Sequence, residues 1–298
     1  MYECVKAGEN TYYMECPAKI GFIVFEAGSR KKVIVVDTGN DNTSAKKIIK
    51  TAEANGWDIE CIFNTHSHAD HIGGNAYLID KLNVTAYTPE CECSFISNTM
   101  MEPALLYGGF PPDLLKNKFF MAPPSFSLPM REMDMPQGLE TVNLPGHCVS
   151  MAGIKSLDGI WFLGDALMGK EVLDKHPITY LYNIKAQLDL LDRLKNLDGE
   201  LFIPAHAEPV RKLDSLIEMN RSRMYEIIDS VMEILREPKT DLQLQQKVYE
   251  KFGIKMNFSQ YYLVGSTVRS YVAYLLNEKE VSHFIKDNTV YFVSEKQE

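Results

Sequence analysis

Residues 66–71 read HSHADH and place three of the seven histidines of the chain, together with one aspartate, within six positions. The apolar run 61–63 before this motif suits a buried strand, and apolar residues recur after it at helical spacing between positions 72 and 82. The motif therefore lies on a turn between a strand and a helix. The first two histidines alternate along extended backbone and can point at one position, whereas Asp70 and His71 open the helix and can point at a second.

Three further ligand-type residues, His147, Asp165 and His206, each follow an apolar run later in the chain. Imidazole and carboxylate ligands without cysteine suit zinc, and also iron or manganese. Because one catalytic zinc needs only three protein ligands, seven candidates predict two divalent metal ions, which a carboxylate can bridge. The remaining histidines, His176 and His283, lack this setting, and we expect them to be ordinary surface or packing residues.

Charge and composition narrow the classes of partner. The net charge is −9, and residues 1–210 carry 18 basic against 27 acidic side chains, whereas residues 211–298 carry 13 of each. This acidity disfavours long-range capture of nucleic acid or of an anionic membrane. The start of the chain has no basic stretch followed by an apolar one, and no run of about 18 apolar residues occurs, so we expect an unanchored cytoplasmic protein. The six cysteines, the pair Cys91-x-Cys93 included, are expected to be free thiols that bind no metal.

The periodicity of the sequence divides the chain into two predicted domains, 1–210 and 211–298. In the first, strands between residues 12 and 36 precede a helix from about Thr43 to Gly56, and strands and helices then alternate. In the second, three helical stretches, the middle one capped by Thr240, precede a hairpin within 281–293. Helices followed by a hairpin indicate a winged-helix-like module, which we expect to pack beside the active site or to form a dimer contact.

Residues 95–136 differ in composition and periodicity from the rest of the first domain. They mix methionine and phenylalanine with seven prolines and follow neither the helical nor the strand period. Three interpretations stay open: a cap over a pocket, a homodimer contact, or a loop packed on its own core.

These motifs resemble those of the metallo-β-lactamase superfamily over about residues 12–210. The HxHxDH motif of that family corresponds to residues 66–71, its first aspartate to Asp37 in VVDTG, and its later ligands follow in the same order. The resemblance implies an α+β fold in which two facing sheets are flanked by helices, an αββα sandwich. It also implies one metal on His66, His68 and His147, a second on Asp70, His71 and His206, and Asp165 as the bridge. Asp37 would hold the other ring nitrogen of a ligand histidine.

The resemblance leaves the substrate open. Secreted β-lactamases lack the bridging aspartate, and the overall shape is closest to lactamase-like and glyoxalase II-like hydrolases with a C-terminal winged helix. We expect a metal-bridging hydroxide that attacks a small-molecule ester, thioester or lactone, with Asp70 orienting the hydroxide and returning its proton. The alternatives are a metal-dependent endoribonuclease acting on single-stranded RNA and a non-heme iron oxidoreductase of the persulfide dioxygenase type.

Overall fold

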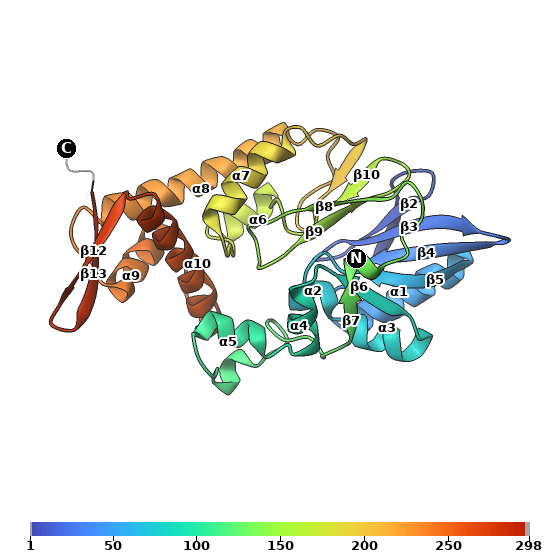
Figure 1. Ribbon diagram of the computed structural model, residues 1–298, viewed down its shortest axis with the longest axis horizontal. Helices are drawn as coiled ribbons and strands as arrows, with labels where there is room; N and C mark the ends of the chain where they lie inside the picture. The colour runs from blue at the N-terminus through green and yellow to red at the C-terminus, as the bar shows by residue number, and fades with distance from the viewer. Residues whose placement is uncertain (1, 296–298) are drawn as a thin grey trace.

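A computed structural model describes residues 2–295, in which two β-sheets face each other and helices cover their outer faces (Figure 1). Within these residues the larger sheet has seven strands in chain order, β1 (Glu3–Lys6), β2 (Thr11–Glu15), β3 (Ile20–Ala27), β4 (Arg30–Val36), β5 (Trp57–Phe63), β6 (Thr85–Thr88) and β7 (Ser127–Pro129). The smaller sheet has the order β11 (Leu201–Ile203), β10 (Ile160–Phe162), β9 (Ala152–Lys155) and β8 (Glu140–Asn143). The predicted αββα sandwich is confirmed.

The core between the two sheets is formed by the inward side chains of both. Ile23 and Phe63 from the larger sheet meet Ile154 and Phe162 from the smaller one, and each is at most 3% exposed. A Cβ atom at Gly21 would lie 2.6 Å from Phe162 Cε1, so only glycine allows the sheets to approach this closely there. This packing holds the carboxyl ends of β5, β10 and β11 at fixed positions.

Helices α1 (Asn42–Asn55) and α3 (Asn75–Leu82) cover the outer face of the larger sheet. The Asp41 side chain caps α1 by accepting the backbone N–H of Thr43, and Gly56 ends the helix with a left-handed φ of 67°. The helix predicted between Thr43 and Gly56 is confirmed. On the outer face of the smaller sheet lies α7 (Ile184–Leu194), whereas α6 (Lys170–Lys175) contacts α8 (Asp214–Ile234).

The C-terminal part contains α8 (Asp214–Ile234), α9 (Asp241–Lys251), α10 (Phe258–Asn277), β12 (Val281–Lys286) and β13 (Thr289–Ser294). The predicted order of three helices and a hairpin is confirmed, including the Thr240 cap, which forms a capping box with Gln243. Asp287 and Asn288 both have positive φ, as a two-residue hairpin turn of type I′ requires.

One hydrophobic cluster runs from Trp161 and Leu188 near the smaller sheet through Val231 of α8 to Tyr271 of α10. No break in packing therefore marks position 210, and the division into domains and the winged-helix assignment stay predictions. The outer limits of those two domains, residue 1 and residues 296–298, lie outside the described residues.

Residues 95–136, the segment rich in methionine, phenylalanine and proline, fold into short elements, some of which contact α10. This segment contains α4 (Glu92–Ser97), α5 (Met101–Tyr107), the 3₁₀ turns η1 (Asp113–Leu115) and η2 (Met130–Glu132), and β7. Leu106 and Phe120 are buried in a cluster that Leu263 of α10 contacts, and Tyr107 lies 5.1 Å from Tyr262 between ring centroids. Figure 1 shows α5 against the end of α10, so this segment links the larger sheet to the C-terminal helices.

Within residues 2–295, none of the helices combines the length and the hydropathy needed to cross a bilayer.

Candidate metal centre

The histidine-rich motif follows β5 and leads into the short helix α2 (Ala69–Ile72). His66 and His68 lie in the loop beyond the last residue of β5, Phe63, rather than in the strand itself. His68 keeps extended backbone and precedes the first helical residue, so the change of backbone direction separates it from Asp70 and His71. The predicted turn between a strand and a helix is therefore present.

The seven predicted ligands converge, although they come from four separate segments of the chain. Two groups are close enough to hold one ion each, with all ligand atoms of a group within 4.8 Å of one another: His66, His68, His147 and Asp165 in the first, and Asp70, His71 and His206 in the second. The membership agrees with the expectation drawn from the family resemblance. The role of these residues as ligands stays a prediction.

Within the first group two ring nitrogens lie at hydrogen-bond distance from a third. His66 Nε2 and His147 Nε2 are 3.0 and 2.9 Å from His68 Nδ1. In the second group His206 Nε2 is 3.2 Å from Asp70 Oδ2.

Asp165 lies between the two groups. Its Oδ1 is 3.1 Å from His71 Nε2, and its Oδ2 is 3.4 Å from both His147 Nε2 and His206 Nε2. This is the position that a bridging carboxylate needs.

Each of these histidines has an outward nitrogen, the ring nitrogen that faces away from the other ligands, and in four of them it has an oxygen partner. His71 Nδ1 donates to Asp37 Oδ2 at 2.8 Å, and His147 Nδ1 and His206 Nδ1 lie 3.1 and 2.8 Å from the carbonyl oxygens of Tyr180 and Pro17. A carbonyl can only accept a hydrogen bond, so these rings carry that proton on Nδ1 and present Nε2 to the centre.

Asp37 supports both groups of ligands. Besides His71, its Oδ2 accepts the hydroxyl of Thr65 at 2.8 Å, and that hydroxyl accepts His66 Nδ1–H at 3.0 Å. Its Oδ1 accepts the backbone N–H of Thr65 at 2.8 Å. The carboxylate thus orients one histidine of each group, as the resemblance led us to expect.

Burial and mutual charge set the protonation of the ligands. Burial lowers the pKa of His66 well below its usual value and that of His68 to about 3, with neighbouring imidazoles adding to the effect. Burial alone would raise the pKa of Asp165, but His206 and His71 hold it well below the usual range. His66 and His68 are therefore neutral and Asp165 is ionised, which are the forms that bind cations. Burial alone would lower the pKa of His71 and His206, but Asp165 and Asp70 raise it, so these two rings would release a proton when they bind an ion.

The residues present fit metal ions. His71 Nε2 and Asp165 Oδ1 are buried and face each other at 3.1 Å, yet neither has a hydrogen-bond partner within residues 2–295. Buried polar atoms are normally paired, and lone pairs that point at a common centre repel one another unless a cation lies among them. The donor set of imidazole and carboxylate suits zinc, iron or manganese.

Two acidic residues near the centre were not anticipated from the sequence. Glu92 of α4 accepts the backbone N–H groups of Ser67 and Ser150, at 3.2 and 2.8 Å, and also binds the Ser67 hydroxyl. Glu102 of α5 approaches His68, and burial, with repulsion from Glu92, raises the pKa of Glu102 to about 8. A single carboxylate in an otherwise apolar segment was the only signal of Glu102 in the sequence.

The remaining histidines and the cysteines lie outside both ligand groups among the described residues. His176 ends α6 and His283 lies on β12, and both are exposed. All six cysteines are unpaired, as expected, and Cys91 is exposed.

Comparisons with known proteins agree with this geometry. The family model described as the Metallo-beta-lactamase superfamily matches residues 15–206. The chain is 22% identical over 321 residues to the probable metallo-hydrolase YqjP of Bacillus subtilis (strain 168), covering 94% of this chain and 96% of that protein.

Two other proteins resemble this chain over very different shares of its length. A crystal structure of a β-lactamase domain protein from Burkholderia ambifaria has a TM-score of 0.73 at 15% identity, covering 98% of this chain and 93% of the other, which shows a shared fold. A shorter match, 31% identical over 70 residues, covers 24% of this chain and 26% of a hydroxyacylglutathione hydrolase from Erythrobacter litoralis (strain HTCC2594).

Proposed function

Because the chain belongs to the metallo-beta-lactamase superfamily, we propose that it is a metal-dependent hydrolase of a small-molecule ester, thioester or lactone. The observation that carries this proposal is the convergence of two ligand groups on either side of the Asp165 carboxylate. Bound divalent ions would supply an activated water and a positive charge to stabilise the oxyanion that develops on the attacked carbonyl.

Asp70 would position the attacking water in this reaction. Its side chain is 37% exposed, more than that of any other of the seven candidate ligands, and its Oδ2 faces His206 Nε2. A carboxylate held on the open side of the centre can accept a proton from the water and return it to the leaving group. The other ligands are more deeply buried and would hold and orient the ions.

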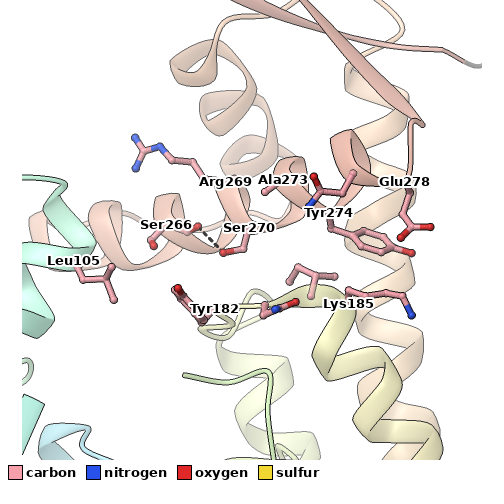
Figure 2. Close-up of a pocket in the computed structure, with 12 residues that line it drawn as sticks. Leu105, Tyr182, Lys185, Ser266, Arg269, Ser270, Ala273, Tyr274 and Glu278 are labelled. Atoms are coloured by element: carbon pink, nitrogen blue, oxygen red, sulfur yellow. Dashed lines mark hydrogen bonds between the residues drawn. The ribbon is translucent and has the colours of Figure 1, made fainter. Parts of the chain in front are cut away.

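A cavity that shares Leu105 with the small pocket at His68 supports a small-molecule substrate. It has a volume of about 460 Å³, within the range of small-ligand sites, and lies between α5, the start of α7 and α10. Leu105 lines this cavity and also the inner pocket that His68 and Glu102 line. Figure 2 shows Leu105 and Tyr182 on the side of α10 that carries Ser266 and Ser270.

The polar groups of this cavity include side chains of both charges, since Lys185 and Glu278 line it together with two serines. Hydroxyl groups of Ser266 and Ser270 line it, whereas the guanidinium of Arg269 pairs with Asp241 at 2.9 Å and points away from the cavity (Figure 2). A substrate whose reactive carbonyl lies at the ligand groups could extend its remaining atoms past Leu105 into this space. The hydroxyacylglutathione hydrolase that matches a short stretch of the chain makes thioesters the first substrates to test.

The experiment combines metal content with a substrate panel. Protein purified without added metal is analysed by mass spectrometry for zinc, iron and manganese, and is then assayed against ester, thioester, lactone and lactam substrates and single-stranded RNA. The proposal predicts two ions per chain and turnover of carbonyl substrates, with Asp70→Asn at least 100-fold slower while it retains metal. Asp80→Asn, an exposed substitution of the same kind, is the control and should leave turnover unchanged.

Other outcomes of this panel would replace the proposal. Salt-sensitive RNA cleavage without carbonyl turnover would favour the endoribonuclease. Iron with thiol-dependent oxygen uptake would favour the oxidoreductase. Undiminished turnover by a metal-loaded Asp70→Asn variant would remove Asp70 from the mechanism.

A further inference from the structure

One of the five histidines in the ligand groups lacks the oxygen partner that the other four have. The outward nitrogens of His66, His71, His147 and His206 lie 2.8 to 3.1 Å from oxygen atoms. His68 differs because it turns Nδ1 toward the other ligands and Nε2 outward. That outward Nε2 is buried and has no hydrogen-bond partner among the described residues.

The carboxyl group of Glu102, whose oxygen can accept a hydrogen bond in either protonation state, faces this unpaired nitrogen. Glu102 Oε1 is 3.6 Å from His68 Nε2, slightly beyond hydrogen-bond distance, and the two side chains are 13% and 14% exposed. When Nδ1 of a neutral imidazole binds a cation, its single proton must be on Nε2. The proton would then point at Glu102, and a shift of a few tenths of an ångström would complete the hydrogen bond.

Glu102 is carried by a different part of the chain from the ligands. It lies in α5, within the segment that packs against α10 through Leu106 and Tyr107. Leu105, on the same short helix, lines both the inner pocket at His68 and the cavity of about 460 Å³ between α5, α7 and α10, and so forms a wall that the two share. A contact that holds Glu102 near His68 therefore also fixes the position of Leu105.

We propose that Glu102 is a positioning residue that accepts the Nε2–H of His68, so that metal binding at the first ligand group and docking of α5 over the site stabilise each other. This rests on the metal-binding part of the proposed function and is independent of the substrate. Because coupling between two events is reciprocal, loss of the carboxylate weakens metal binding, and loss of metal loosens α5.

The first test measures zinc affinity by competition with a chromophoric chelator. Substitution of the hydrogen-bond partner of a ligand histidine typically lowers metal affinity 10- to 100-fold, and Glu102→Ala should fall in this range. Glu102→Gln retains an acceptor oxygen without the charge and should lose less affinity than Glu102→Ala. Glu132→Gln, in the same segment but more exposed, is the matched control and should bind zinc as the wild type does.

The second test follows amide hydrogen exchange in residues 101–107 with and without zinc. In the wild type zinc should slow exchange in this helix, and in Glu102→Ala it should not. Leu105→Ala keeps the carboxylate and should retain most of the zinc-dependent protection, which separates the hydrogen bond from general packing of the helix.

The outcomes distinguish this inference from the proposed function. If the wild type binds no divalent ion, both are wrong. If the wild type binds two ions and Glu102→Ala binds them equally tightly, or if zinc leaves exchange in α5 unchanged, this inference alone is wrong. Slower turnover in Glu102→Ala with unchanged zinc affinity and exchange would assign Glu102 to the substrate and would also overturn it.

Discussion

Replacing Asp37 with asparagine tests whether one carboxylate orients a histidine in each ligand group. Asp37 accepts hydrogen bonds from three donors at 2.8 Å: His71 Nδ1, Thr65 Oγ1 and the Thr65 backbone N–H. It is 2% exposed, and its φ of 60° is a left-handed conformation that asparagine tolerates as well as aspartate. The substitution therefore changes the hydrogen bonds and the charge while the backbone stays as it is.

An asparagine at this position cannot accept from all three donors. If its amide nitrogen faces the Thr65 backbone, two N–H groups oppose each other, and the charge is lost in either orientation. If the nitrogen faces His71, the ring must move its proton to Nε2 and can no longer present that atom to a cation. One charge-assisted hydrogen bond is worth about 1.5–3 kcal/mol, so we expect the metal-free protein to lose about that much free energy of unfolding.

Zinc affinity should fall as well, whereas a substitution that changed only the folding stability would leave the affinity of the folded protein unchanged. Substitution of such outer partners lowers metal affinity about 10- to 100-fold, which corresponds to about 1.4–2.7 kcal/mol. The assays are urea unfolding of the metal-free protein and zinc titration against a chelator. Asp287→Asn is the matched control, because Asp287 also has a left-handed φ, of 51°, but lies exposed in the hairpin turn. Wild-type zinc affinity and stability in Asp37→Asn would refute the reasoning.

Three further predictions concern the metal, a helix cap and the thiols. Removal of bound metal by a chelator should lower the free energy of unfolding by about 2.7 kcal/mol if free metal had been present at 100 times its dissociation constant, as thermal unfolding at fixed metal concentrations can measure. Asp41→Ala should destabilise α1 by about 1 kcal/mol in urea unfolding at pH 6. Burial alone would raise the pKa of Asp41, but hydrogen bonds from Thr43 lower it below the usual 3.8. The stabilisation of the folded protein by the ionised Asp41 is therefore complete above pH 3.8 and disappears as the pH falls through the lower pKa of the folded state. Equal destabilisation by Asp41→Ala at pH 6 and pH 2 would contradict this. Iodoacetamide at pH 8 should modify exposed Cys91 long before Cys61, whose pKa burial raises to about 12, and peptide mass spectrometry would reveal the reverse order.

Local signals in the sequence were sufficient for most of the elements and for the types of residue at the centre. The helix over 42–55 begins at an aspartate that accepts a nearby backbone N–H and ends at a left-handed glycine, and both signals act within a few residues. The seven ligand candidates stood out because imidazole and carboxylate groups at the ends of apolar runs are rarely explained by packing alone. The family resemblance added the arrangement of the two sheets, which no local signal contains.

Long-range packing decided what the sequence left open. Residue 210 was a reasonable boundary by periodicity, yet side chains on both sides of it share one hydrophobic cluster, because α8 packs on α7 and α9 alike. Residues 95–136 showed no period because their short elements are stabilised by contacts with several distant parts of the fold rather than by amphipathic faces of their own. Phe120 packs toward α10, Ile96 packs on α2, and Met133 lies in the core between the sheets.

The sequence by itself determined which side chains could bind metal, since ligand chemistry belongs to each residue type wherever it lies. Only the tertiary structure decided which histidine Asp37 meets, 34 positions along the chain, and that Glu102, separated from His68 by the same number of positions, lies beside the ligands. Contacts over such separations depend on how the sheets and α10 pack, and this packing brings the Glu102 carboxylate to the outward nitrogen of His68.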